Sequence, residues 1–317
     1  MKVLRTSTER FEKLIDYPFT PHYLTIPDGE DGQLQIHYLD EGLKEQRIVL
    51  LLHGEPTWSY LYRKMIPGLV AAGHRVVAPD LVGFGKSDKP TKKSDYTIMR
   101  HIAWMEAWLK AMDLKRVTLF GQDWGSIIGL ILAMRNSSRF ERIVIANGGL
   151  PDPARRHHKL FLQAMANSYD SKALKNWRQE AATAKELQIS DVMTRIGGGL
   201  TLLPSEKKAY DAPFPDASYQ AGALVFPSLI TPQLLDEDAK KILVETWTAL
   251  DQWQKPFLTA YGKADPLLGW SDQIFQARVP GSKGQPHQEF PDATHFIQEQ
   301  KPSELVEIIN KFIALTK

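Results

Sequence analysis

The segment Val117-Thr118-Leu119-Phe120-Gly121-Gln122-Asp123-Trp124-Gly125 is the strongest indication of the fold class, because it joins an apolar run to a tight turn. Residues 117–120 predict a buried strand, and residues 125–134 have the periodicity of a helix. Glycines on both sides of the turn let the backbone bend sharply and present Asp123 at the carboxyl end of the strand. Asp123 is therefore a candidate nucleophile, although an Asp in this position also serves simply as a helix cap.

The alternation of strand and helix continues on both sides of this segment. Runs that are apolar on every residue are typical of parallel strands covered by helices on both faces. We expect strands at residues 22–26, 33–39, 48–52, 75–78, 117–120, 143–146 and 256–261, and helices at 61–72, 98–112 and 125–134. The pattern predicts an α/β fold with a mostly parallel, doubly wound sheet.

The alternation stops after Gly148-Gly149-Leu150-Pro151 and resumes near Lys255-Pro256. Residues 172–189, rich in Ala, Lys, Glu and Gln, predict a helix, and residues 197–199 and 211–215 predict breaks between short helices. We expect a main domain of residues 1–149 and 229–317, and an inserted helical cap domain of residues 150–228.

Composition excludes several classes of protein. Lys plus Arg number 39 against 37 for Asp plus Glu, so no excess of positive charge indicates a nucleic-acid or membrane partner. There are 0 cysteines, which excludes disulfides, thiolate zinc sites and cysteine nucleophiles. No metal or other cofactor is expected. Neither a secretory signal nor a membrane-spanning run is recognisable, so we expect a cytoplasmic monomer or small homo-oligomer.

Two further residues follow Asp123 in the order nucleophile, acid, histidine. Asp265 comes just after the strand that ends near Tyr261, and His295 follows a short strand-like segment at residues 288–290. Both lie on loops at strand ends, where sheets of this kind assemble their sites. Taken singly, Asp265 is also a common turn residue before proline, and His295 a common surface or capping histidine. Their joint placement favours a catalytic triad with Asp123.

His53-Gly54-Glu55-Pro56 comes directly after the predicted strand at residues 48–52. In a fold of this kind, this loop supplies one backbone N–H to an oxyanion hole, and the residue after the nucleophile supplies the other. The expected donors are the backbone N–H groups of Glu55 and Trp124. A His-Gly pair alone is weak support, since the Glu55 side chain is also compatible with an ordinary loop charge.

The chain resembles the haloalkane dehalogenases, which have the α/β-hydrolase fold, over nearly its whole length. The resemblance lies in His53-Gly54-Glu55-Pro56-Thr57-Trp58, residues 60–67, residues 83–90, Gln122-Asp123-Trp124-Gly125 and residues 212–216. It implies that Asp123 displaces halide from a haloalkane to form an alkyl ester. Water activated by His295, with Asp265 orienting the imidazole, then frees a primary alcohol, halide and a proton, a reaction suited to detoxification. The implied partners are a small halogenated alkane, water and halide ion.

The resemblance also implies two halide-binding indoles and an apolar substrate pocket. Trp124 follows the nucleophile, and the best match to the second indole is Trp177 in the cap, although a single tryptophan on a helix usually just packs. Indole N–H groups suit a halide because they donate a hydrogen bond without a positive charge. The matched pocket residues, for which core packing is the alternative, are Phe226, Pro227, Ile230, Leu267 and Leu268. Ser126 and Thr294 depart from the family, where glycine is common.

Three alternatives stay open. An epoxide hydrolase uses the same Asp-His-Asp triad but needs acids to protonate the ring oxygen, for which Tyr169, Tyr210 and Tyr219 are available. A fluoroacetate dehalogenase requires an arginine pair that the sequence does not place. A non-catalytic homologue would keep the fold and bind an apolar ligand without turnover.

Overall fold

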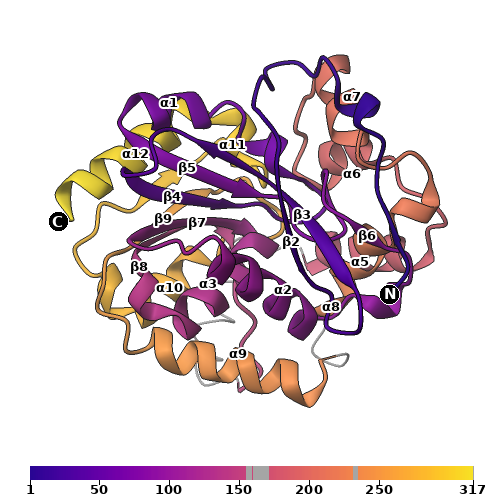
Figure 1. The fold of residues 1–317 in the computed structure, drawn as a ribbon. Helices are drawn as coiled ribbons and strands as arrows, with labels where there is room; N and C mark the ends of the chain where they lie inside the picture. The colour runs from indigo at the N-terminus through magenta and orange to yellow at the C-terminus, as the bar shows by residue number, and fades with distance from the viewer. Residues whose placement is uncertain (155–158, 160–170, 231–234, 317) are drawn as a thin grey trace.

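A computed structural model describes residues 1–154, 159, 171–230 and 235–316. Its centre is an eight-stranded sheet of order β10-β9-β8-β7-β4-β5-β3-β2 (Figure 1). From β10 to β5 neighbouring strands are parallel, whereas β3 pairs antiparallel with β5 and β2 antiparallel with β3. The strands are β2 (His22–Pro27), β3 (Gln33–Glu41), β4 (Arg47–Leu52), β5 (His74–Pro79), β7 (Val117–Asp123), β8 (Phe140–Gly148), β9 (Phe257–Gly262) and β10 (Gln288–Phe290). The predicted α/β class with a mostly parallel sheet is confirmed.

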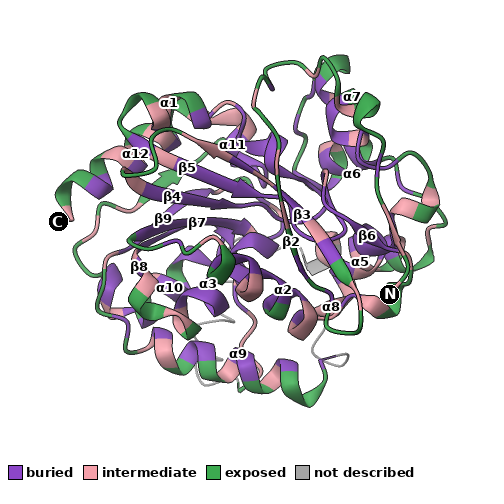
Figure 2. Cartoon of the chain, viewed as in Figure 1, coloured by how far each residue is buried: buried purple, intermediate pink, exposed green. Residues whose placement is uncertain are grey.

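Helices cover both faces of the sheet. In Figure 1, α1 (Ile66–Ala71) and α12 (Pro302–Leu315) lie on one face, and α2 (Ile98–Ala111), α3 (Trp124–Arg135) and α9 (Glu237–Leu250) lie on the other. The central strands are therefore buried on both sides, as Figure 2 shows, and this explains why β4 is almost continuously apolar. Two further helices, α10 (Asp272–Arg278) and α11 (Ile297–Gln300), follow β9 and β10 in the sequence.

Shorter elements complete the frame. The two-residue strands β1 (Val3–Leu4) and β6 (Lys89–Pro90) pair antiparallel. The 3-10 helices are η1 (Thr8–Phe11), η2 (Ser59–Tyr62), η3 (Lys93–Asp95), η4 (Ser137–Arg139), η5 (Ala217–Tyr219) and η6 (Pro280–Ser282). The prediction of one helix over residues 61–72 is wrong, because α1 begins only at Ile66, after η2. Pro67 lies in the first turn of α1, where its missing N–H is tolerated, and it could not continue a helix from residue 61.

Between β8 and α9 the described chain forms α5 (Ser171–Thr183), α6 (Ile189–Ile196), α7 (Pro204–Asp211) and α8 (Ala221–Leu229). The prediction of one helix over residues 172–189 is wrong, since α5 ends at Thr183. Between α5 and α6, side chains instead of helix carbonyls accept hydrogen bonds from the backbone. The Gln220 carboxamide accepts from the Leu187 N–H, and at the start of α6 Asp211 accepts from the Ser190 N–H. The predicted breaks at residues 197–199 and 211–215 follow α6 and α7. We call residues 150–228 the inserted segment; their status as a separate domain stays a prediction.

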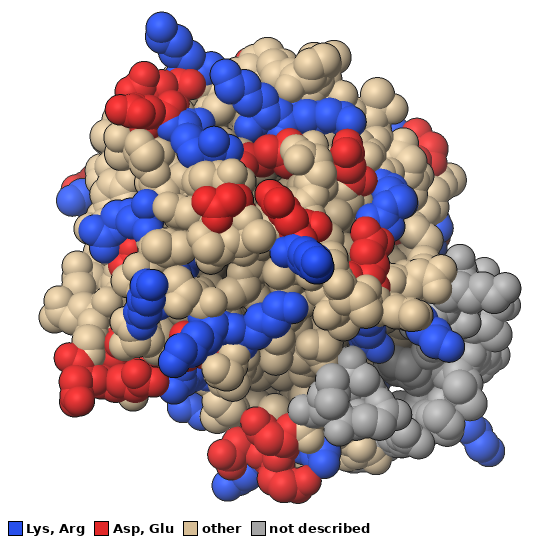
Figure 3. Space-filling model, turned by 90° about the vertical axis from the view of Figure 1, so that its right-hand side faces the viewer, with Lys and Arg blue, Asp and Glu red and all other residues tan. Residues whose placement is uncertain are grey.

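The molecular surface carries charges of both signs. On the face in Figure 3, lysine and arginine side chains are interspersed with aspartate and glutamate. Within the ranges given above, no helix combines the length and the apolar character needed to cross a membrane.

Candidate active site

Asp123 is the last residue of β7, and α3 starts at the next residue. Its backbone has φ 51° and ψ −124°, a conformation that residues with side chains rarely adopt. Close packing holds the turn: a Cβ on Gly125 would lie 1.9 Å from the Leu52 carbonyl oxygen, and one on Gly121 would lie 2.8 Å from the Gly125 oxygen. The two glycines therefore let α3 press against β4 and β7, and this contact forces the Asp123 side chain outward from the strand end.

The loop after β4 reaches the same carboxylate. The backbone N–H of Glu55 donates to Asp123 Oδ1 at 2.8 Å. A Cβ on Gly54 would lie 2.4 Å from the Asp123 Cβ, so only glycine permits this approach. Trp124 is the first residue of α3, whose initial N–H groups have no partner within the helix. The Glu55 N–H is thus in place for one donor of the predicted oxyanion hole, whereas the role of the Trp124 N–H stays a prediction.

His295 links the two carboxylates. Its Nδ1 lies 2.9 Å from Asp265 Oδ2, and its Nε2 lies 3.5 Å from Asp123 Oδ2. His295 and Asp265 are both buried, with side chains 1% and 0% exposed. The structure therefore brings together the three residues that the sequence predicted as a triad, from segments 142 and 30 residues apart.

Asn147 is a neighbour of Asp265 that sequence reasoning missed. Its Nδ2 donates to Asp265 Oδ2 at 2.8 Å and to the Gly262 carbonyl at 3.0 Å, and its Oδ1 accepts from the Gly262 N–H at 2.8 Å. Asp265 Oδ1 also accepts from the Leu267 N–H. These contacts fix the carboxylate that orients His295. The only available signal was the position of Asn147 near the end of the strand next to β7.

The protonation of His295 depends on its two carboxylate neighbours. Burial alone disfavours the imidazolium, but the negative charges of Asp265 and Asp123 outweigh this effect and raise the pKa of His295 to about 10. The pKa of Asp265 shifts in the opposite direction. Burial raises this pKa, but the contact with His295 outweighs burial and lowers the pKa of the carboxyl. The Gln122 amide donates to the His295 carbonyl and lies 3.2 Å from Nε2, where it is a partner for the neutral ring.

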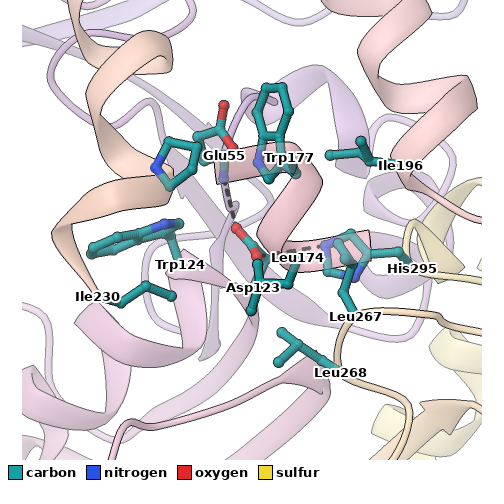
Figure 4. Close-up of a pocket in the computed structure, with 11 residues that line it drawn as sticks. Glu55, Asp123, Trp124, Leu174, Trp177, Ile196, Ile230, Leu267, Leu268 and His295 are labelled. Atoms are coloured by element: carbon teal, nitrogen blue, oxygen red, sulfur yellow. Dashed lines mark hydrogen bonds and ion pairs between the residues drawn. The ribbon is translucent and has the colours of Figure 1, made fainter. Parts of the chain in front are cut away.

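A small, largely apolar cavity of about 40 Å³ opens above Asp123 (Figure 4). Its ionisable lining residues are Asp123, His295 and Glu55. Burial, followed by the charge of Asp123, raises the pKa of Glu55 well above its usual value, so the cavity favours a neutral Glu55. The Trp177 indole hydrogen-bonds to Glu55 and thereby orients its N–H in the cavity. The full lining is Glu55, Asp123, Trp124, Leu174, Trp177, Ile196, Pro227, Ile230, Leu267, Leu268 and His295.

Most of the predicted pocket residues lie at this cavity. Trp124 and Trp177 both line it, each only 3% exposed, and so do Pro227, Ile230, Leu267 and Leu268. Phe226 does not line it; its ring packs on Trp124 with centroids 4.6 Å apart. Leu174 and Ile196 were missed. Leu174 lies three residues before Trp177, one helical turn along α5, which is a signal that the sequence contained.

The two departures from the family pattern have structural partners. The Ser126 hydroxyl donates to the carbonyl oxygens of Asp123 at 2.6 Å and Gly149 at 2.9 Å, which ties the turn to the end of β8. The Thr294 hydroxyl donates to Gln300 Oε1 at 3.0 Å, and its backbone N–H donates to the same oxygen. Both side chains therefore add contacts around the site.

The described lining of the cavity does not include the groups that two competing reactions need. Among the described residues, no tyrosine, arginine or lysine lines it. Tyr210 donates to Glu299 instead, Tyr219 lies in η5 away from the cavity, and Tyr169 falls outside the described residues. Within those residues there is also no group of three His, Cys, Asp or Glu side chains arranged to hold a metal ion.

Comparison with known proteins gives consistent matches. The family model described as the α/β hydrolase fold matches residues 47–302. A haloalkane dehalogenase of Psychrobacter cryohalolentis is 43% identical over 313 residues, covering 99% of this chain and 98% of the relative. Haloalkane dehalogenase 1 of Mycobacterium bovis is 47% identical over 307 residues, covering 97% of each chain.

A solved structure gives the same result. The tetrameric haloalkane dehalogenase DpaA from Paraglaciecola agarilytica NO2 superposes with a TM-score of 0.84 at 34% identity, covering 99% of this chain and 98% of that chain.

Proposed function

Because the chain belongs to the α/β-hydrolase family and, within it, to the haloalkane dehalogenases, we propose that Asp123, His295 and Asp265 are its catalytic triad. The reaction is hydrolytic cleavage of a carbon–halogen bond. The observation that carries the proposal is the placement of the Asp123 carboxylate in an apolar cavity between two indoles and a histidine.

The first step is displacement of halide by Asp123. Oδ1 is engaged by the Glu55 N–H, so Oδ2 is the oxygen that attacks the carbon. The carbon–oxygen bond forms as the carbon–halogen bond breaks, and the halide leaves with the bonding electron pair. Trp124 donates its indole N–H group to the departing anion, and Trp177 donates to it by giving up its hydrogen bond to Glu55. Apolar surroundings strengthen these hydrogen bonds, because no water competes for the halide.

The second step is hydrolysis of the ester on Asp123. Esterification removes the Asp123 charge that helps to raise the pKa of His295, so the pKa falls and the neutral imidazole, which can act as a base, is favoured. It takes a proton from water, the water oxygen attacks Cγ of Asp123, and negative charge develops on Oδ1 opposite the Glu55 and Trp124 N–H groups. Asp265 stabilises the imidazolium. Collapse of the intermediate transfers the proton of the imidazolium to the departing alcohol oxygen. The resulting carboxylic acid of Asp123 releases the product proton and becomes a carboxylate again.

The size of the cavity favours short haloalkanes as substrates. A volume of about 40 Å³ corresponds to roughly three water molecules. A primary haloalkane of two to a few carbons, such as 1,2-dibromoethane, fits this space better than a long-chain or ring-bearing halide. The proposed substrate class is therefore short haloalkanes, which give a primary alcohol, halide and a proton.

The decisive experiment measures bromide released from 1,2-dibromoethane and 1-bromobutane, beside diol formation from styrene oxide. We expect bromide release by the wild-type protein and none by Asp123→Asn, whose amide is a poor nucleophile. Diol formation without bromide release would contradict the proposal and indicate an epoxide hydrolase. Uptake of haloalkane without either product would indicate a non-catalytic binding protein.

Three further expectations also stay proposals. The inserted segment, residues 150–228, forms a cap domain over the main domain. The tetrameric state of the relative DpaA supports assembly of this chain into a small homo-oligomer, which light scattering after size exclusion would measure. A cytoplasmic location is the third, and cell fractionation tests it.

A further inference from the structure

Five polar side chains form a second buried group outside the cavity, which we call the Arg63 cluster: Arg63, Lys64, Glu206, Tyr210 and Glu299. Arg63 and Lys64 directly follow η2, Glu206 and Tyr210 lie on α7 in the inserted segment, and Glu299 lies on α11. The Arg63 side chain is 0% exposed and that of Glu299 3%, whereas that of Lys64 is 30% exposed, so the centre of the group is shielded from water and Lys64 lies at its edge. Two cations face two carboxylates, and the cluster is neutral overall.

Contacts within the cluster are dense. Arg63 donates to Glu206 Oε1 at 2.5 Å and to Glu299 Oε1 at 2.5 Å and Oε2 at 3.0 Å. Lys64 Nζ bridges the same two carboxylates at 2.8 Å each. The Tyr210 hydroxyl donates to Glu299 Oε1. Glu299 therefore receives donors from both the main part of the chain and the inserted segment.

Glu299 is four residues after His295, on the short helix that follows it. Gln300, on the same helix, accepts hydrogen bonds from the backbone and side chain of Thr294. The His295 backbone N–H donates to the Gly197 carbonyl at the end of α6, at 3.2 Å. The loop that holds His295 is thus fastened on one side to α11 and on the other to the inserted segment.

We propose that the Arg63 cluster positions His295 for the hydrolysis step, so that docking of α7 on α11 sets the rate at which the alkyl-enzyme is hydrolysed. Glu206 and Tyr210 are positioning residues that contact no reacting atom. Tyr210 acts through Glu299 directly, and Glu206 acts on Glu299 through Arg63 and Lys64. This inference rests on the proposed function.

Substitutions in the Arg63 cluster should affect alkylation and hydrolysis differently. Alkylation needs Asp123, which is fixed by β7, α3 and the loop at Glu55, and none of these contacts involves the cluster. Hydrolysis needs His295 within reach of the attacking water. A displacement of about 1 Å in a reacting group lowers a rate by up to roughly 100-fold. Loosening α11 should therefore slow hydrolysis and leave alkylation unchanged.

The test uses Glu206→Gln, which removes the charge facing Arg63 and Lys64, and Tyr210→Phe, which removes a single hydroxyl. Rapid quenching after mixing with 1,2-dibromoethane gives the halide burst, and the intact mass gives the fraction of alkyl-enzyme. We expect the burst rate to stay unchanged, kcat to fall, and alkyl-enzyme to accumulate, more in Glu206→Gln than in Tyr210→Phe.

Asp40→Asn is the matched control, because it breaks the two-bond ion pair with Arg75 between β3 and β5, away from His295. The control should accumulate no alkyl-enzyme. Equal slowing of both steps in the cluster variants, or wild-type hydrolysis in both of them, would overturn the inference. If Glu206→Gln does not fold, the result for Tyr210→Phe decides. Absence of halide release by the wild type would instead refute the proposed function itself.

Discussion

The two oxygens of Asp123 have different partners, and this difference gives them different roles. Oδ1 accepts from the Glu55 N–H at 2.8 Å, whereas Oδ2 lies 3.5 Å from His295 Nε2. The first oxygen is already placed where charge develops during ester hydrolysis, and the second faces the base. In the proposed mechanism the same carboxylate therefore serves as nucleophile in one step and as the site of the oxyanion in the next.

Removing either indole N–H should weaken halide binding. Trp124→Phe and Trp177→Phe keep an aromatic ring but lose a donor to an anion, which costs about 1.5–3 kcal/mol, or on the order of 10- to 100-fold in bromide affinity. Quenching of tryptophan fluorescence by bromide measures the affinity. Trp253→Phe is the control, because Trp253 is buried outside the cavity lining. Unchanged affinity in Trp177→Phe would show that this indole only packs.

Asp123→Asn should lower the pKa of His295 from its value of about 10, because it removes one of the two carboxylates that stabilise the imidazolium. The amide resembles the uncharged ester of the alkyl-enzyme. A base must be deprotonated, so a pKa that falls in this variant means that esterification itself activates His295. Titration of the imidazole nitrogens by NMR gives the value. An identical pKa in wild type and variant would contradict the proposed coupling.

At the level of elements, the turn between β7 and α3 depends on close packing against β4. Leu52 ends β4 and its carbonyl oxygen lies where a side chain at position 125 would begin. The apolar strand pattern and the flanking glycines were sufficient to predict β7, the turn and α3. The sequence was less informative for α1 and α5, because the ends of these helices depend on Pro67 and on side-chain partners from distant segments such as Asp211 and Gln220.

Gly125→Ala should disturb the turn and the activity together. The added Cβ would lie 1.9 Å from the Leu52 oxygen, so backbone must shift, at a cost of about 1–3 kcal/mol in the free energy of unfolding. Denaturant unfolding and bromide release measure the two effects. Gly149→Ala, where the nearest atom would be 3.4 Å away, is the control and should stay near wild type. Wild-type stability and activity in Gly125→Ala would contradict this account of the elbow.

In the whole molecule, the site forms where the ends of β4, β7, β8 and β9 meet helices of the inserted segment. Residues at strand ends, such as Asp123 and Asp265, were predictable because parallel strands bring their carboxyl ends to one edge. Asn147, Gln122 and Ile196 were not, since their roles depend on which side chains of distant segments face them. The contacts of His295 with Gly197 and of α11 with α7 follow only from the packed structure.

In the proposed mechanism Asp123 forms a covalent ester that His295 helps to hydrolyse. The most direct measurement is the intact mass of His295→Gln after incubation with 1,2-dibromoethane, followed by peptide mapping. We predict that one bromoethyl group per chain accumulates on the peptide that contains Asp123, with one equivalent of bromide released and no turnover beyond it. Continued turnover without an adduct, or an adduct on another residue, would contradict the mechanism.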